Sequence, residues 1–124
     1  MADHITLGKK GEDIAAKHLS GLGYQIVERN WRFEKDEIDI IAMDGEFLVF
    51  VEVKTRSSNW YGEPYEAVDD RKEKLIVRGA EAYVVKKDLY NEVRFDIVSI
   101  VIDGNKQTIN HMKEAFYPGI GEYG

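Results

Sequence analysis

The first helix is predicted by the spacing of apolar residues near the start of the chain. Between residues 7 and 22, apolar or small side chains recur at every third or fourth position. This spacing places them on one face of an α-helix. Thr6 is suited to cap that helix, and Gly21 or Gly23 to end it. His18 lies on the apolar side, where we expect a hydrogen-bonded core histidine rather than a metal ligand.

A second helix is predicted over residues 67–87, with Asp69 or Asp70 as its cap. Its apolar face would consist of Leu75, Ile76, Gly79, Ala80, Tyr83 and Val84.

The remaining apolar segments have the character of strands. They are residues 24–33, two runs within 36–56, residues 92–102, and a short closing strand at 106–112. A turn at Asp103-Gly104-Asn105 would end the strand at 92–102. The predicted order is therefore α-β-β-β-α-β-β. Strands and helices mixed in this way form an α/β (α+β) domain in which the helices pack on a mixed sheet.

A hairpin predicted within residues 36–56 determines which charged side chains of this segment should lie close together. Asp44-Gly45 between two apolar runs is a strong signal for a two-residue turn. If those two residues form the loop, Ile41 faces Leu48 and Glu37 faces Glu52. Side chains alternate along a strand, so Glu37, Asp39 and Ile41 share one side. Asp39 would then be diagonal to Glu52, about 7 Å away.

These residues form a candidate site because charge is costly at the end of a covered strand. Phe47 to Val51 is apolar on both faces, and Glu52 and Lys54 continue it without a turn. Carboxylates brought together there favour a bound cation. A surface ion pair is the alternative. Glu12, at the edge of the first helix beside Gly8 and Gly11, is equally suited to solvent or to this site.

Composition indicates one domain over residues 1–116, followed by a glycine-rich, flexible tail at 117–124. The 124 residues contain no cysteine, no secretion signal and no run long enough to span a membrane, which predicts a cytoplasmic protein. The net charge of −6 argues against nucleic acid as a partner unless the basic residues are gathered locally.

The second helix provides such a local concentration of positive charge. Residues 71–87 contain six basic and two acidic residues, with Arg71, Lys74 and Arg78 in one sector. A solvated helix face is the alternative use of these side chains. Trp60 and Tyr61, in the loop before the helix, could stack on bases, although anchoring a loop is the commoner use of such aromatics.

The pattern of Asp39, then Glu52-Val53-Lys54, between two helices resembles the PD-(D/E)XK nuclease superfamily. Within it the chain is similar to the bacterial YraN-like family, which is related to archaeal Holliday-junction resolvases. The resemblance covers nearly the whole chain and is strongest in Phe-Val-Glu-Val-Lys-Thr-Arg at residues 50–56. Asp36 departs from the family, which commonly has glycine there.

The resemblance implies a restriction-endonuclease-like core in which Glu12, Asp39 and Glu52 hold a metal and Lys54 is catalytic. Glu37 is left open as a ligand, a supporting residue or an idle neighbour. Oxygen ligands alone select Mg²⁺ or Mn²⁺ over zinc. The candidate nucleic-acid-binding residues are Arg56, Trp60, Tyr61, Arg71, Lys72, Lys74 and Arg78.

We therefore expect a Mg²⁺- or Mn²⁺-dependent endonuclease that acts on DNA, with branched or otherwise structured DNA as a candidate substrate and a homodimer as a candidate assembly. The alternative is a catalytically silent nucleic-acid-binding or scaffold domain with a nuclease fold. Retention of all the polar site residues favours the enzyme, and the acidic net charge favours the alternative.

Overall fold

The computed structural model describes residues 6–57 and 68–117 and has the predicted order of elements. The elements are α1 (Thr6–Gly21), β1 (Gln25–Phe33), β2 (Asp36–Asp44), β3 (Phe47–Ser57), α2 (Asp70–Lys87), β4 (Val93–Asp103) and β5 (Lys106–Met112). The predicted loop residues Trp60 and Tyr61, and the predicted tail beyond Tyr117, lie outside the described residues. No helix in the described ranges is long and apolar enough to cross a membrane.

The five strands form one mixed sheet in the order β1-β2-β3-β4-β5. Neighbouring strands are antiparallel except β3 and β4, which are parallel. The parallel pair follows from the connection, since α2 carries the chain back along the sheet before β4 begins. This is a mixed α/β fold with the strand and helix order of a restriction-endonuclease-like core.

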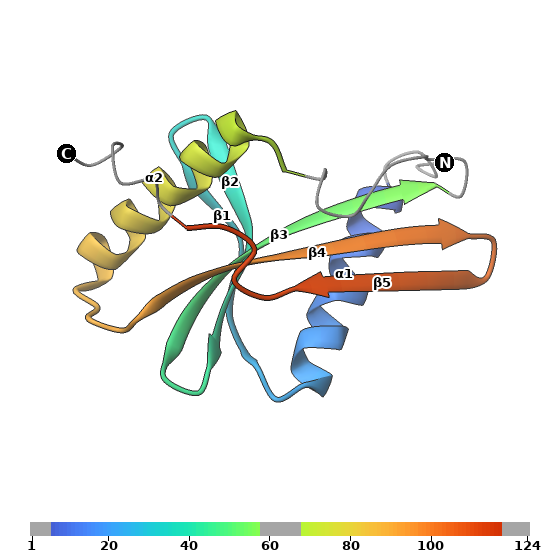
Figure 1. Ribbon diagram of the computed structural model, residues 1–124, viewed down its shortest axis with the longest axis horizontal. Coiled ribbons are helices and arrows are strands. Elements are labelled where there is room, and N and C mark those ends of the chain that lie inside the picture. The colour runs from blue at the N-terminus through green and yellow to red at the C-terminus, as the bar shows by residue number, and fades with distance from the viewer. Residues whose placement is uncertain (1–5, 58–67, 118–124) are drawn as a thin grey trace.

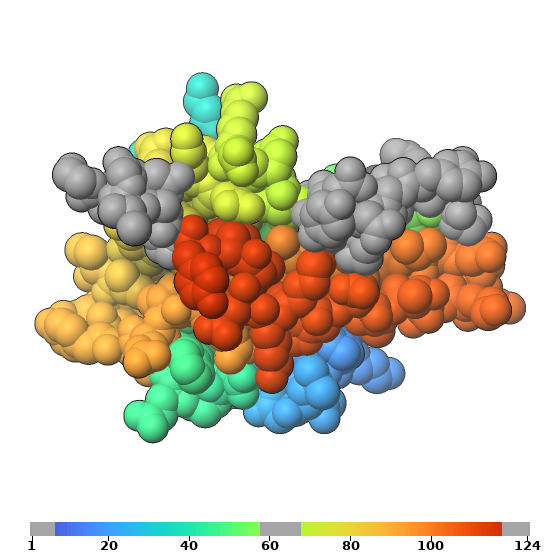
Figure 2. All heavy atoms as spheres, in the orientation of Figure 1, coloured from blue at the N-terminus to red at the C-terminus, as the bar shows by residue number. Residues whose placement is uncertain are grey.

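The two helices cover opposite faces of the sheet (Figure 1). On one face, Ala15 and Leu19 of α1 pack with Val49, Val51 and other β-branched residues of the central strands. On the other, α2 packs on a cluster that contains aromatic side chains from both the helix and the sheet, including Tyr83, Phe50 and Phe95. In the space-filling view the helices likewise emerge on opposite sides of β4 and β5 (Figure 2). The central strand β3 is therefore buried on both faces, as its sequence predicts.

Helix α1 approaches β3 closely at Gly11. A Cβ atom added there would lie 1.7 Å from Oγ1 of Thr55, so only glycine fits. The contact fixes the position of the next residue, Glu12, over the end of the central strands.

Helix α2 begins at Asp70, later than the predicted start at residue 67. The Asp69 side chain caps the helix by accepting a hydrogen bond of 2.9 Å from the backbone N–H of Lys72. An aspartate in this position satisfies one of the free N–H groups of the first turn, which explains why the helix begins here.

The predicted register of the central hairpin is wrong by two residues. The loop consists of Gly45 and Glu46, and Ile41 pairs with Phe50 rather than Leu48. Asp44 remains in β2 because its carboxylate accepts a hydrogen bond of 2.9 Å from Arg94 of β4. Gly45 has a φ of 61°, which suits the first position of a type II′ turn.

A buried polar network ties β4 to β5 and α1. Asp96 is fully buried and accepts hydrogen bonds from Arg94, His111, Tyr24 and the backbone N–H of Glu114. Burial alone would raise the pKa of Asp96, but the hydrogen bonds from His111 and Arg94 outweigh it and lower this pKa to about 2.

The predicted core histidine belongs to the same network. Nε2 of His18 lies 3.2 Å from Nδ1 of His111, so this ring has a hydrogen-bond partner, as expected.

Candidate metal centre

The candidate site lies where β2 and β3 separate. Within the described strands, pairing of β2 with β3 runs from Asp44–Phe47 and ends at Ile40–Val51. At the next position the Asp39 carboxylate accepts a hydrogen bond of 2.8 Å from the backbone N–H of Val53. A side chain therefore takes the place of a backbone partner, and the two strands part around it.

The alternation of side chains in β2 also breaks at Asp39. Ile40 packs in the cluster on the α1 side of the sheet, and Ile41 in the cluster on the α2 side. Regular alternation would place Ile38 with Ile40, yet Ile38 packs with Ile41 against α2. The prediction that Glu37, Asp39 and Ile41 share one face of the strand therefore does not hold, because the chain turns the Asp39 carboxylate toward β3.

Three carboxylates from two elements meet at this opening. Glu12 of α1 and Glu37 and Asp39 of β2 each offer an oxygen atom, and these atoms lie within 4.8 Å of one another. The structure thus brings Glu12 beside Asp39, a position that the residue pattern alone left open and that the resemblance implied. It also places Glu37 beside the other two acids.

Glu52 adjoins this cluster through Asp39. Continuing the observed register by one position sets Glu52 opposite Asp39. The Glu52 side chain is only 12% exposed, and its Oε2 lies 3.8 Å from Nζ of Lys72 on α2. Among the described residues, its buried Oε1 has no hydrogen-bond partner. Asp39 is therefore common to the outer group with Glu12 and Glu37 and to an inner pair with Glu52.

The inner pair is strongly perturbed. Burial, followed by the negative charge of Asp39, raises the pKa of Glu52 to about 8. Burial is also the largest influence on Asp39, whose pKa is raised despite the hydrogen bond from Val53. The positive charge of Lys72 opposes the shift in both residues. A cation bound between these carboxylates would remove the repulsion and reverse these shifts.

The outer acids have partners that the sequence analysis missed. Arg29 donates to Oε1 of Glu12 at 3.1 Å, and Asn30 to its Oε2 at 2.7 Å. Asn30 also donates to Oε1 of Glu37 at 3.3 Å, and Arg32 to its Oε2 at 3.2 Å. We call Arg29, Asn30 and Arg32 the β1 donors. The resemblance to the YraN-like family includes Arg29-Asn30, and this pair was the signal in the sequence that could have indicated them.

The basic candidates surround the site unevenly. Lys54 is exposed on β3, and its positive charge acts to lower the pKa of Glu52. Lys72 contacts the site directly through Glu52. Arg56 is partly buried farther along β3.

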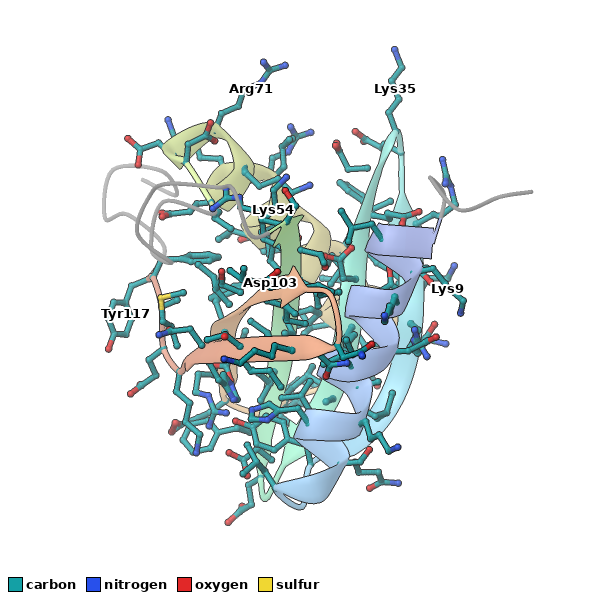
Figure 3. All side chains as sticks on the ribbon, turned by 90° about the vertical axis from the view of Figure 1, so that its right-hand side faces the viewer. Lys9, Lys35, Lys54, Arg71, Asp103 and Tyr117 are labelled. Atoms are coloured by element: carbon teal, nitrogen blue, oxygen red, sulfur yellow. The ribbon has the colours of Figure 1, made fainter. Side chains whose placement is uncertain are left out.

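The predicted strip on α2 is exposed as expected, with Arg71, Lys74 and Arg78 all reaching solvent. Arg71 projects from the same end of the molecule as Lys35, above Lys54 (Figure 3). Nη2 of Arg78 lies 3.6 Å from Oε1 of Glu34 in the β1–β2 turn, so part of its charge is already offset.

The residues present fit a hard divalent cation. All the available ligand atoms are carboxylate oxygens, which Mg²⁺ and Mn²⁺ prefer. The buried Oε1 of Glu52 supports this fit, because an unpaired buried carboxylate oxygen is costly without a cation.

A restriction-endonuclease-like core with an acidic candidate metal centre is the class of protein that this fold and site define. The sequence model of the uncharacterised protein family UPF0102 matches residues 11–100. The chain belongs to that family.

Relatives match over nearly their whole length. The chain is 46% identical over 117 residues to a UPF0102 protein of Flavobacterium psychrophilum, covering 94% of this chain and 98% of the relative. It is 47% identical over 118 residues to one from Bacteroides thetaiotaomicron, with 95% and 98% covered. It is 48% identical over 120 residues to one from Chlorobaculum tepidum, with 91% and 93% covered.

Proposed function

We propose that this protein is a Mg²⁺- or Mn²⁺-dependent endonuclease that hydrolyses phosphodiester bonds in DNA. The observation that carries the proposal is the inner pair at the β2–β3 opening. Two carboxylates are held together in a poorly solvated position, one with an unpaired buried oxygen, and a lysine follows two residues later on the same strand. A structural ion pair gives no reason to bury two carboxylates together, whereas a bound cation would stabilise them.

Each residue has a distinct role in the proposed reaction. Glu12, Asp39 and Glu52 would hold the cation, and Glu37, beside Glu12 and Asp39, would offer a further oxygen ligand. The bound ion would polarise the phosphodiester and favour ionisation of the attacking water. Lys54 would orient that water or offset the charge that develops on the phosphate in the transition state.

The basic residues of α2 near the metal centre would bind the DNA backbone. Arg71, Lys74 and Arg78 extend along the exposed face of α2, and Lys72 links that helix to the metal centre. Phosphate contacts are local, so they can overcome an acidic net charge if the substrate meets this helix first. We propose a cytoplasmic enzyme that acts alone or as a homodimer on branched or otherwise structured DNA.

A second candidate function is supported by the β1 donors. Each carboxylate oxygen of Glu12 and Glu37 already accepts a hydrogen bond from the protein. Acids that are satisfied in this way can persist without a metal. This favours a silent domain that binds nucleic acid through its nuclease fold.

A cleavage panel separates the two functions. Single-stranded, duplex, flap and four-way-junction DNA would be incubated with Mn²⁺ and either wild-type protein or Glu52→Gln, both purified by the same procedure. The proposal predicts cleavage of at least one substrate by the wild type and loss of cleavage in the variant. Binding without cleavage of any substrate would support the silent domain. Equal cleavage by both proteins would indicate a contaminating nuclease.

A further inference from the structure

One amide group bridges two acids of the candidate metal centre. The same nitrogen atom of Asn30 donates to Oε2 of Glu12, on α1, and to Oε1 of Glu37, on β2. The remaining oxygen of each carboxylate accepts a hydrogen bond from an arginine of the same strand. Arg29 donates to Oε1 of Glu12, and Arg32 donates to Oε2 of Glu37. Asn30 is therefore the one member of the β1 donors that contacts both acids, and it connects a helix to a strand.

The backbone at Asn30 is specialised for this contact. Its φ of 53° lies in the left-handed region, which asparagine tolerates better than most residues but which is rare within a strand. Arg29 pairs with Ile40 and Trp31 pairs with Ile38, so Asn30 lies between them at the level of Asp39. The left-handed residue of β1 thus lies level with the break in side-chain alternation on β2, and residues in such backbone conformations cluster at functional sites.

The bridging bonds leave the acids able to bind a cation. A carboxylate oxygen has two lone pairs, and each hydrogen bond from Asn30 uses one of them. A donor outside the ligand shell fixes the orientation of a ligand and strengthens metal binding. The amide also carries no charge, so it holds two like charges together without competing with a cation as a third arginine would.

We propose that Asn30 is a positioning residue of the metal centre, which sets Glu12 and Glu37 at the spacing that a divalent cation requires. This inference rests on the proposed function, since it assumes that the acids bind Mg²⁺ or Mn²⁺. A positioning role differs from a purely structural role because replacing Asn30 should then change the metal affinity as well as the stability.

The test compares two glycine substitutions in the same hairpin. Asn30→Gly removes the amide but retains the left-handed backbone, which glycine adopts without strain. Glu34→Gly is the matched control, because Glu34 also has a left-handed φ, of 54°, and contacts Arg78 rather than the acids. Mn²⁺ affinity would be measured by titration calorimetry, and urea unfolding without metal would confirm that both variants fold.

We expect Asn30→Gly to bind Mn²⁺ roughly tenfold or more weakly than the wild type, on the scale seen for other residues that orient metal ligands. Glu34→Gly should retain the wild-type affinity. An Asn30→Gly protein that binds Mn²⁺ as tightly as the wild type would overturn the inference while leaving the proposed function intact. A wild type that binds no Mn²⁺ would instead overturn the metal centre itself, and the inference with it.

Discussion

Replacing Glu52 by glutamine should stabilise the metal-free protein at neutral pH. Glu52 has an ordinary pKa of 4.5 that burial and the charge of Asp39 raise to about 8 in the fold. A carboxyl whose pKa is higher in the folded state binds its proton more tightly there. Stability is therefore lost as the pH rises from about 4.5 toward 8, where the folded protein must ionise this residue.

The magnitude follows from the size of that shift. Each pKa unit corresponds to about 1.4 kcal/mol, so between pH 4.5 and 7 the wild type should lose about 3 kcal/mol through Glu52. The side chain is only 12% exposed, so solvent screens this effect little. A neutral glutamine has no such loss. Glu52→Gln should therefore gain stability relative to the wild type over this pH range.

Urea unfolding in the presence of a chelator, at several pH values between 4.5 and 8, would measure this difference. Ionisable groups that do not contact residue 52 are common to both proteins, so the pH dependence of the difference reports Glu52 together with its neighbour Asp39. Mn²⁺ should then restore stability to the wild type at pH 7 but have little effect on the variant, because a ligand that binds only the folded state stabilises it. A difference between the two proteins that does not change with pH would refute the electrostatic description of the site.

Three further predictions concern the rest of the molecule. Asp39→Asn should blunt the rise in thermal midpoint that Mn²⁺ produces in the wild type, and an equal rise in both, measured by differential scanning fluorimetry, would exclude Asp39 as a ligand. Replacing Arg71, Lys74 and Arg78 by glutamine should reduce the slope of log affinity against log salt for duplex DNA by about 2.7, measured by fluorescence anisotropy, and an unchanged slope would leave the strip a solvated face. Asp96, whose pKa is lowered to about 2, should add about 2 kcal/mol to the free energy of unfolding, and this stability should be lost as the pH falls from about 4 to 2. In acid unfolding, Asp96→Asn should lack this loss. A fall in stability like that of the wild type would contradict the prediction.

Much of the fold could be predicted from local sequence. The apolar period predicted α1 within about one residue at each end, and β5 at its observed bounds. The candidate site residues on β3 were recognisable because charge interrupts a strand that is otherwise apolar on both faces. These features depend on residues close together in the chain.

The hairpin register could not be predicted because it depends on a distant residue. Asp44-Gly45 is a sound turn signal, but Arg94 of β4 holds Asp44 at the end of β2 and moves the loop forward by one residue. That shift alters every cross-strand pair and sets Asp39 rather than Glu37 opposite Glu52. Local turn chemistry therefore gave the correct hairpin with the wrong partners.

The arrangement of the acids was also beyond sequence patterns. Strand periodicity assumes regular alternation, which fails at Asp39, where the carboxylate replaces a backbone partner of β3. The contact of Asn30 with Glu12 and Glu37 depends on a left-handed residue within a strand and on the close approach of α1 at Gly11. Such features arise from packing between elements.

The central claim is that this site performs metal-dependent phosphodiester hydrolysis, and single-turnover cleavage by Lys54→Ala tests it most directly. Wild type and variant would be compared on a four-way junction with saturating Mn²⁺, after calorimetry has established how tightly each binds the ion. We predict that Lys54→Ala binds Mn²⁺ nearly as well as the wild type but loses cleavage, since the lysine acts on the water or the transition state rather than on the ion. Cleavage by the variant at the wild-type rate, or no Mn²⁺-dependent cleavage by the wild type, would contradict the claim.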